Sequence, residues 1–242
     1  MKIAICLSGI SNICKESLDH FLSSIMHLDA DVYIHSWINL GIADGLINIF
    51  PNVKKITLEH QDKKNKWNYI VKDLSVNPAN TAFQLYGISE SFKLALNSNI
   101  KYDFFVRCRF DVFVGNKIKY ENLNSECMHM LPNGRSMPIE SSKIFYEKIN
   151  IHPLPKDFFW ICNQKGAEVS ANLFKDAEYY NIYEGIPMIG EDLMFHHFAK
   201  NDIQIELLEN NQLNGLYRPL GHHHGNGLII YDSFGPKKYS SS

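Results

Sequence analysis

The chain alternates between short apolar runs and longer stretches with apolar residues at helical spacing. The runs 2–9, 30–37 and 53–60 are rich in β-branched residues, which predicts strands. Residues 15–27 and 80–97 carry apolar side chains three and four positions apart, which predicts helices. A strand, a helix and a second strand within about forty residues are typical of a parallel sheet.

The second half of the chain orders its elements differently. Residues 102–114 predict one hydrophobic strand, and 115–155, with clusters of Asn, Gly, Ser and Pro, predict a loop with short strands. There follow a strand at 157–163, helices at 165–180 and 190–201, and a strand at 203–209. This order predicts an α/β fold with an open mixed, mostly parallel sheet flanked by helices, in which ligands bind at the carboxyl ends of the strands.

Length and composition fit one domain. The chain has 242 residues, of which 45% are hydrophobic, enough to bury a sizeable core. We expect a single domain over 1–235 and a flexible C-terminal tail over 236–242. The formal net charge of −2 argues against a broad basic surface, so nucleic acid is not an expected partner. Any anionic ligand must therefore be bound by individual groups at its site and not attracted by the net charge of the protein.

Cysteine usage and hydropathy bear on the location of the protein. The five cysteines include no C-x-x-C pair, so neither a zinc ribbon nor a disulfide framework is indicated. Free thiols are typical of a reducing cytosol, and we expect a cytoplasmic protein. The apolar N-terminus lacks the features of a signal peptide, and no run of about eighteen apolar residues predicts a transmembrane helix. Peripheral contact with the inner face of the cytoplasmic membrane stays open.

Three charged residues interrupt the most hydrophobic strand. Arg107, Arg109 and Asp111 stand at alternate positions of residues 102–114, which places them on one side of a regular strand. Because a buried unpaired charge is costly, they should pair with one another or meet a ligand. An ion pair at the strand end is one explanation. The other is a ligand site, since arginine forms a planar fork for a diphosphate and a carboxylate is a hard ligand for Mn²⁺ or Mg²⁺.

The same stretch resembles a motif of nucleotide-sugar glycosyltransferases of the GT-A type. In that family a hydrophobic strand ends in Asp-x-Asp, and the last aspartate holds the divalent cation that bridges the donor's diphosphate. Asp111 matches this last aspartate, whereas Arg109 stands where the first one would be. This is a departure from the family pattern, and a positive side chain here could partly replace the cation in neutralising the diphosphate.

Other stretches resemble bacterial capsule and lipopolysaccharide glycosyltransferase-like proteins. These proteins read a strand with Ser-Gly, a second strand ending in Ile-His-x-Trp as at 34–37, and Arg-x-Arg-x-Asp as at 107–111. Glu191 and Asp192 resemble the Glu-Asp that begins a helix in inverting GT-A enzymes, where the aspartate is the general base.

The resemblance implies a GT-A-like fold with a Rossmann-like nucleotide-binding half. It also implies an inverting transfer of a sugar from a nucleotide-sugar donor to a glycan or glycolipid acceptor, in cell-surface polysaccharide synthesis. The first alternative function is a non-catalytic nucleotide-sugar or glycan-binding module with a degraded Asp-x-Asp motif. The second alternative is another nucleotide-using enzyme, such as a phosphotransferase or a nucleotidyltransferase.

Further donor-binding candidates stand at strand ends and on a helix. Ser8 and Gly9 follow the first strand, where they either let a nucleotide approach the backbone or form an ordinary turn. His35 stands near the end of the second strand and either faces a ligand or is a satisfied core residue. Gln84 lies on the helix 80–97, which runs near the donor in the resembled family. Arg218 is a further phosphate ligand or a surface ion-pair partner.

The acceptor and metal candidates lie later in the chain. Asp157 and Trp160 could bind sugar hydroxyls and a sugar face, or they could be a turn residue and a core aromatic residue. His222 and His224 could complete the shell of a divalent cation held by Asp111, or they could be solvated loop residues.

Overall fold

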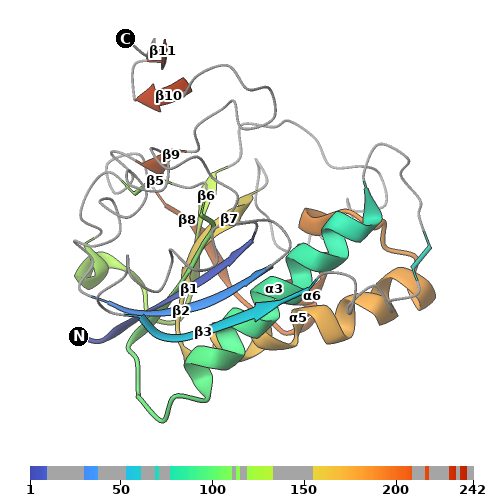
Figure 1. Ribbon diagram of the computed structural model, residues 1–242, viewed down its shortest axis with the longest axis horizontal. Helices are drawn as coiled ribbons and strands as arrows, with labels where there is room; N and C mark the ends of the chain where they lie inside the picture. Colours follow the sequence, from blue (N-terminus) through green and yellow to red (C-terminus); the bar gives the residue numbers. More distant parts are fainter. Residues whose placement is uncertain are drawn as a thin grey trace.

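The computed structural model describes residues 1–9, 30–37, 53–60, 69–70, 77–110, 113–114, 119–132, 155–208, 216–217, 229–232 and 235–238. One seven-stranded sheet organises the fold, with the order β3-β2-β1-β4-β7-β6-β8 (Figure 1). Its strands are β1 (Ile3–Gly9), β2 (Asp31–Trp37), β3 (Val53–Glu59), β4 (Phe104–Cys108), β6 (Met128–Pro132), β7 (Pro155–Cys162) and β8 (Ile205–Leu207).

The sheet is mixed and mostly parallel, which confirms the predicted fold class. Parallel pairing joins β3 to β2, β2 to β1 and β1 to β4. Strand β7 runs antiparallel to both β4 and β6, and β8 is parallel to β6. The carboxyl ends of β1 to β4 and the amino end of β7 therefore lie at the same edge of the sheet.

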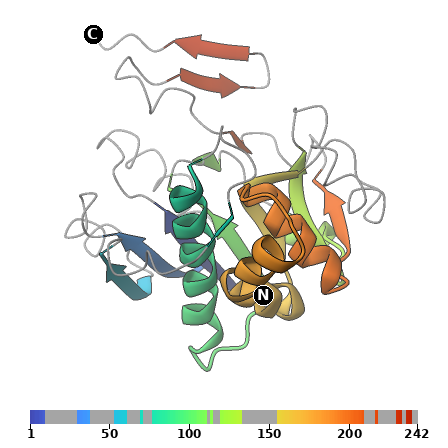
Figure 2. The same cartoon turned by 90° about the vertical axis from the view of Figure 1, so that its right-hand side faces the viewer.

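In the part of the chain that the structure describes, three helices cover one face of the sheet (Figures 1 and 2). They are α3 (Pro78–Leu96), α5 (Gln164–Tyr183) and α6 (Gly190–Lys200), and each lies close to a predicted helix. Helix α3 begins at Asn77, whose side chain accepts a hydrogen bond from the backbone N–H of Ala79, with Pro78 in the first turn. The predicted helix at 15–27 lies outside the described residues.

Both faces of the central strands are buried, as expected for parallel strands. Alternate residues such as Cys6, Phe105 and Trp160 pack with the helices in one apolar core. The intervening residues of the strands form a second core, which includes Tyr120 of the 3-10 helix η3 (Tyr120–Asn122) and Leu123, which follows it.

The predicted long strand over 102–114 is wrong. Strand β4 ends at Cys108, Phe110 lies in a turn, and the separate short strand β5 (Phe113–Val114) pairs with β9 (Leu216–Tyr217). Arg107 is therefore the only arginine inside β4, and Arg109 follows the strand. A hairpin of β10 (Ile229–Asp232) and β11 (Gly235–Lys238) extends into the residues assigned to a tail.

Replacing Gly166 with alanine is expected to destabilise the fold. A Cβ atom at this position, in the first turn of α5, would lie 2.6 Å from Cys162 Cβ and 3.2 Å from its Sγ. Overpacking of this kind lowers the free energy of unfolding by about 1–3 kcal/mol, which denaturant titration would measure. Gly190→Ala is the control, because its Cβ would meet Gln84 at an ordinary 3.6 Å. Equal losses in both variants would contradict the close packing of α5 on β7.

Acid is expected to destabilise the contact between α5 and α6. The buried His197 imidazole contacts Tyr180 Oη at 3.1 Å and the Val169 carbonyl at 2.9 Å. Burial lowers the pKa of His197 below its ordinary value, although the Val169 carbonyl and Asp176 oppose this change. Below about pH 6.5 the unfolded chain therefore binds a proton at His197 that the folded chain does not. The free energy of unfolding then decreases as the pH is lowered.

Thermal melts between about pH 7.5 and 5.5 would measure this effect. The Tm should fall with pH, and it should fall less in His197→Gln, which lacks the titrating group. For a chain of this size each 1 kcal/mol corresponds to about 2–4 °C. The same pH slope in both proteins would show that His197 does not contribute.

Candidate functional site

Predicted site residues from several elements stand at or near the carboxyl edge of the sheet. Strand pairing aligns Ser8 with His35, and Gly9 follows at the end of β1. Arg109 comes directly after β4, and Asp157 lies near the amino end of the antiparallel β7. This edge is where open α/β sheets bind ligands.

The end of β1 has a backbone conformation that requires glycine. Gly9 has a φ of +136°, a conformation that residues other than glycine rarely adopt. Its carbonyl accepts a hydrogen bond from the Ser36 hydroxyl at 3.1 Å, which ties the ends of β1 and β2 together. Ser8 is buried. Gly9 therefore presents backbone, without a side chain, at the edge.

His35 lies in an aromatic cluster behind the edge. Its buried ring makes edge contacts with Trp37 and Tyr86, at centroid distances of 4.9 and 5.3 Å. Its Nε2 lies 3.5 Å from Glu59 Oε2, and the Tyr86 hydroxyl donates to Glu59 Oε1 at 3.4 Å. A Cβ on Gly87 would lie 3.4 Å from His35 Nδ1, so glycine lets α3 pack closely here. Sequence reasoning missed Glu59, although an acid at a strand's carboxyl end was the available signal.

The two arginines have different surroundings. Arg107 is 1% exposed, and its Nη1 donates to the carbonyls of Ser8, at 3.2 Å, and of Cys108. Its guanidinium also lies 5.9 Å from the centre of the Trp160 ring. Arg109 is partly exposed after the strand end. Arg109 is therefore the more accessible of the two arginines, whereas Arg107 is buried and binds strand-end carbonyls.

Trp160 belongs to the core on the helix side. Its buried ring stacks on Phe92 with an interplanar angle of 9° and meets the edge of Phe198 at a centroid distance of 5.8 Å. Contact between this ring and an acceptor sugar would therefore require the surrounding side chains to move.

Gln84 connects three elements of the site. Its Nε2 donates a hydrogen bond to Asp157 Oδ2, which joins α3 to the beginning of β7. Its Oε1 would lie 3.6 Å from a Cβ on Gly190, the first residue of α6. The residues predicted for donor and acceptor binding, Gln84 and Asp157, are therefore in direct contact beside the start of α6.

The first turn of α6 carries two acids. Asp192 is 7% exposed, whereas Glu191 is more exposed. Consecutive helical residues point about 100° apart, so the two side chains face different surroundings. The partial positive charge of a helix N-terminus favours the ionised carboxylate over its protonated form.

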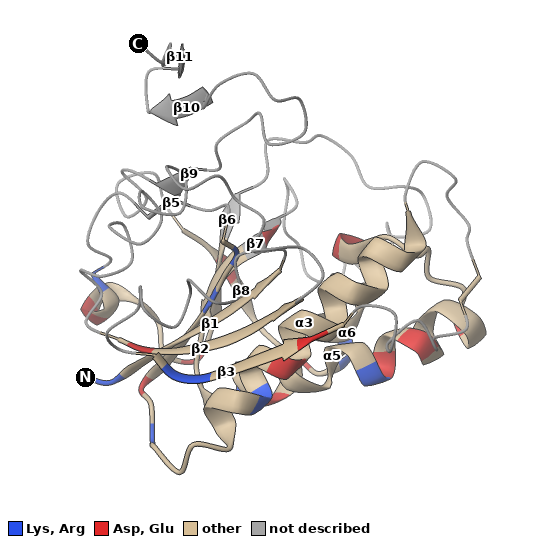
Figure 3. Ribbon diagram, viewed as in Figure 1, with Lys and Arg blue, Asp and Glu red and all other residues tan. Residues whose placement is uncertain are grey.

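Several predicted site residues lie outside the described residues. They are Asp111, Arg218, His222 and His224. Among the residues that the structure describes, no group of three His, Cys, Asp or Glu side chains could hold a metal ion. No described helix is long and apolar enough to cross a membrane. Lys and Arg are interspersed with Asp and Glu over the described elements (Figure 3).

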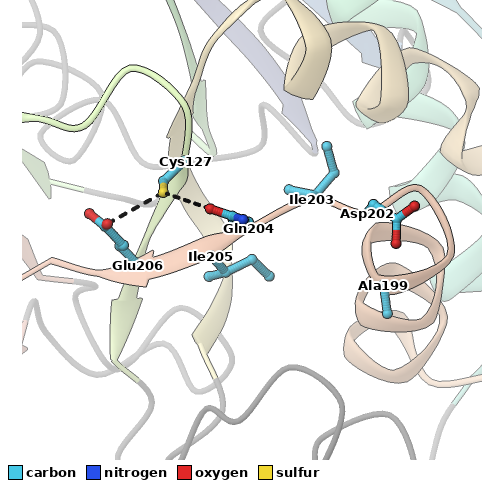
Figure 4. Close-up of a pocket in the computed structure, with 7 residues that line it drawn as sticks. All are labelled: Cys127, Ala199, Asp202, Ile203, Gln204, Ile205 and Glu206. Carbon is cyan, nitrogen blue, oxygen red and sulfur yellow. Dashed lines mark hydrogen bonds between the residues drawn. The ribbon is translucent and has the colours of Figure 1, made fainter.

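A hollow of about 480 Å³ lies at the opposite edge of the sheet (Figure 4). Its lining residues are Cys127, Ala199, Asp202, Ile203, Gln204, Ile205 and Glu206. The Cys127 thiol donates to Glu206 Oε1 at 3.3 Å. Burial, with the nearby Glu206, raises the pKa of Cys127 to about 11, so the thiol stays protonated and weakly nucleophilic at neutral pH.

The protein is thus an α/β protein with an open mixed sheet, and its candidate site lies at the carboxyl ends of strands β1 to β4. No family model and no curated protein matches the chain. A similar solved structure is the galactosyltransferase LgtC in complex with donor and acceptor sugar analogs. Its TM-score is 0.47 and its identity 9%, over 87% of this chain and 74% of that chain.

The chain is also similar to the bifunctional glycosyltransferase WbbM in its apo structure. The TM-score is 0.44 and the identity 14%, over 86% of this chain. The chain spans 38% of the length of WbbM. At these identities the likeness concerns the fold. Both of those proteins are glycosyltransferases.

Proposed function

We propose that the chain is a glycosyltransferase that moves a sugar from a nucleotide-sugar donor to a glycan or glycolipid acceptor, with inversion at the anomeric carbon. The observation that carries this proposal is the contact of Gln84 with Asp157 next to Gly190. This contact brings Asp157, the residue predicted to bind the acceptor, close to the beginning of α6, which carries the predicted base, Asp192. The motif resemblance around Arg109 and Asp111 supports the donor side.

Donor binding requires neutralisation of the diphosphate that leaves. Arg109, partly exposed beyond β4, offers a planar fork of donors for phosphate oxygens. Asp111 follows two residues later, and its carboxylate suits a divalent cation. When bound, Mn²⁺ or Mg²⁺ would stabilise negative charge on the leaving group. The bare backbone of Gly9 leaves room for the nucleotide to approach.

The acceptor side requires a base. Asp157, oriented by Gln84, accepts a hydrogen bond from an acceptor hydroxyl. The attacking hydroxyl oxygen bonds to the anomeric carbon as the bond from that carbon to the phosphate oxygen breaks. Its proton passes to Asp192, and the nucleoside diphosphate leaves. This single displacement inverts the configuration. A role in cell-surface polysaccharide synthesis, at the inner face of the cytoplasmic membrane, rests on the motif resemblance.

A thermal-shift screen of UDP-, GDP-, CMP- and dTDP-sugars, with and without Mn²⁺, tests donor binding. A ligand at about a hundred times its Kd stabilises by about 2.7 kcal/mol, which corresponds to about 5–10 °C in Tm. Product analysis with the donor that binds then identifies the reaction. Release of the intact nucleotide, which is the nucleoside diphosphate or, from a CMP-sugar, CMP, supports sugar transfer. Release of sugar 1-phosphate from a nucleoside diphosphate sugar indicates nucleotidyl transfer, and binding without turnover at any acceptor indicates a binding module.

A further inference from the structure

Strand β8 is an outer strand of the sheet with one open backbone edge. It pairs with β6 on one side, and no other described strand lies beside it. The Gln204 carbonyl and the Leu208 N–H each form a backbone hydrogen bond of 2.8 Å with a residue of β6. Backbone groups of successive residues in a strand point to opposite sides. Those of Ile205 and Leu207 therefore point away from β6.

Space for another strand lies beside this edge. The hollow of about 480 Å³ is lined by the consecutive residues 202–206 (Figure 4). Ile205 packs against the core under the helices, whereas Glu206 on the other face of the strand is hydrogen-bonded to Cys127. Because residues from both faces of β8 line the hollow, the edge between them is accessible to another chain.

The two outer strands of the described sheet differ in charge. Strand β3 carries the exposed Lys54 and Lys55, and lysines on an outer strand hinder its pairing with a second chain. Residues 203–207 along β8 read Ile-Gln-Ile-Glu-Leu, without lysine or arginine. Strand β8 therefore lacks the protection that β3 has. Its run is short, so pairing through it would be reversible.

The run 203–207 is complementary to itself when two copies meet antiparallel about a two-fold axis at Ile205. Residues directly opposite each other in such a pair lie on the same face. This register places the Gln204 amide of each copy opposite the Glu206 carboxylate of the other, to which it can donate a hydrogen bond. Moving the axis by one residue in either direction would place Glu206 opposite Glu206 or Asp202, which are pairs of like charge.

We propose that the chain forms a symmetric dimer in which the β8 strands of two copies pair antiparallel about Ile205. The two Ile205 residues exchange both of their backbone hydrogen bonds, and the Leu207 N–H of each copy donates to the Ile203 carbonyl of the other. The Ile203 N–H takes no part, because it already donates to the Phe198 carbonyl at 3.0 Å. The pairing joins the two sheets into one.

The direction of β8 determines where the two candidate sites lie in the dimer. Strand β7 is antiparallel to both β4 and β6, and β8 is parallel to β6, so β8 runs in the direction of β4. The carboxyl edges of two antiparallel copies therefore face opposite directions. Each candidate site lies on its own side of the joined sheet, and the dimer does not depend on the proposed function.

Sedimentation equilibrium of the full chain tests for the dimer. We expect a reversible monomer–dimer equilibrium with a Kd in the micromolar range, because the paired surface is small. A chain that stays monomeric up to submillimolar concentration would overturn the proposal.

Exchange of charges tests the register. Gln204→Glu places two carboxylates opposite each other at both ends of the pairing, so the Kd of the dimer should rise about tenfold or more. The double variant Gln204→Glu/Glu206→Gln again places an amide opposite a carboxylate, so its Kd should return close to that of wild type. Both side chains are exposed, and thermal melts of dilute protein would check that each variant is folded. An unchanged Kd in Gln204→Glu, or a double variant as weak as the single one, would overturn the proposal.

Amide hydrogen exchange measured by NMR tests the edge in the unaltered chain. The amides of Ile205 and Leu207 should exchange more slowly in concentrated protein than in dilute protein, because they bond to the second copy only in the dimer. The Leu208 amide, which bonds to β6 in each copy, is the internal control and should show no such dependence. If Ile205 exchanges equally fast at both concentrations in a protein that dimerises, the copies meet elsewhere and the proposal is wrong.

Discussion

Replacing Asp192 with asparagine is expected to cut turnover at least about a hundredfold, because general-base catalysis contributes roughly 10²- to 10⁴-fold. The amide keeps the size of the side chain but cannot take a proton. Donor affinity should stay nearly unchanged, since Asp192 acts on the acceptor hydroxyl. The loss of a carboxylate in the first turn of α6 costs about 0.3–1 kcal/mol, so Tm should change by only a few degrees.

Glu191→Gln is the matched comparison, because it removes the neighbouring acid of the same helix turn. The assignment of the base to Asp192 predicts a smaller loss of turnover there. Initial rates at saturating donor and the anomeric configuration of the product would be measured for both variants. Turnover of Asp192→Asn within about fivefold of wild type, or a retained configuration, would refute an inverting reaction with Asp192 as base.

Replacing Asp111 with alanine is expected to abolish the metal-dependent part of donor binding. Loss of a residue that only supports a metal ligand costs about 10- to 100-fold in affinity, so loss of a direct ligand should cost at least that much. Calorimetric titration of the donor with and without Mn²⁺ would measure it. Normal donor affinity and turnover of Asp111→Ala across a Mn²⁺ titration would contradict the hypothesis that Asp111 binds the cation.

Arg109→Ala tests the contribution of the arginine that stands two residues before Asp111. A hydrogen bond to a charged group contributes about 1.5–3 kcal/mol, so donor affinity should fall about tenfold or more even without metal. Equal affinity in a folded Arg109→Ala protein would favour the alternative explanation, an ion pair at the strand end.

Local sequence patterns determined much of the fold. Apolar periodicity predicted helices α3, α5 and α6 and strands β1, β2, β3, β7 and β8 near their observed positions, because burial of one face imposes a fixed spacing along the chain. The order of these elements also predicted an open mixed sheet. That order placed Ser8, Gly9 and His35 at strand ends, which a parallel sheet brings to one edge.

The extent of β4 was a local feature that periodicity did not reveal. The alternation of apolar and charged residues continues to Asp111, yet the strand ends at Cys108. Alternation describes which residues could share a face of a strand. Pairing with β1 and β7 decides how far the strand runs, since the backbone needs hydrogen-bonding partners on neighbouring strands.

Only the tertiary structure decided which side chains meet. The contact between Gln84 and Asp157 spans 73 positions, and that between Arg107 and the Ser8 carbonyl spans 99. Burial of Trp160 against Phe92 likewise depends on how α3 lies on the sheet. The pairing of Glu184 with His196 depends on how α5 packs on α6. The sequence by itself thus determined the elements and the edge at which the candidate site lies, because spacing is a local property. The partners of each charged group followed from the packing of distant segments, which no local pattern encodes.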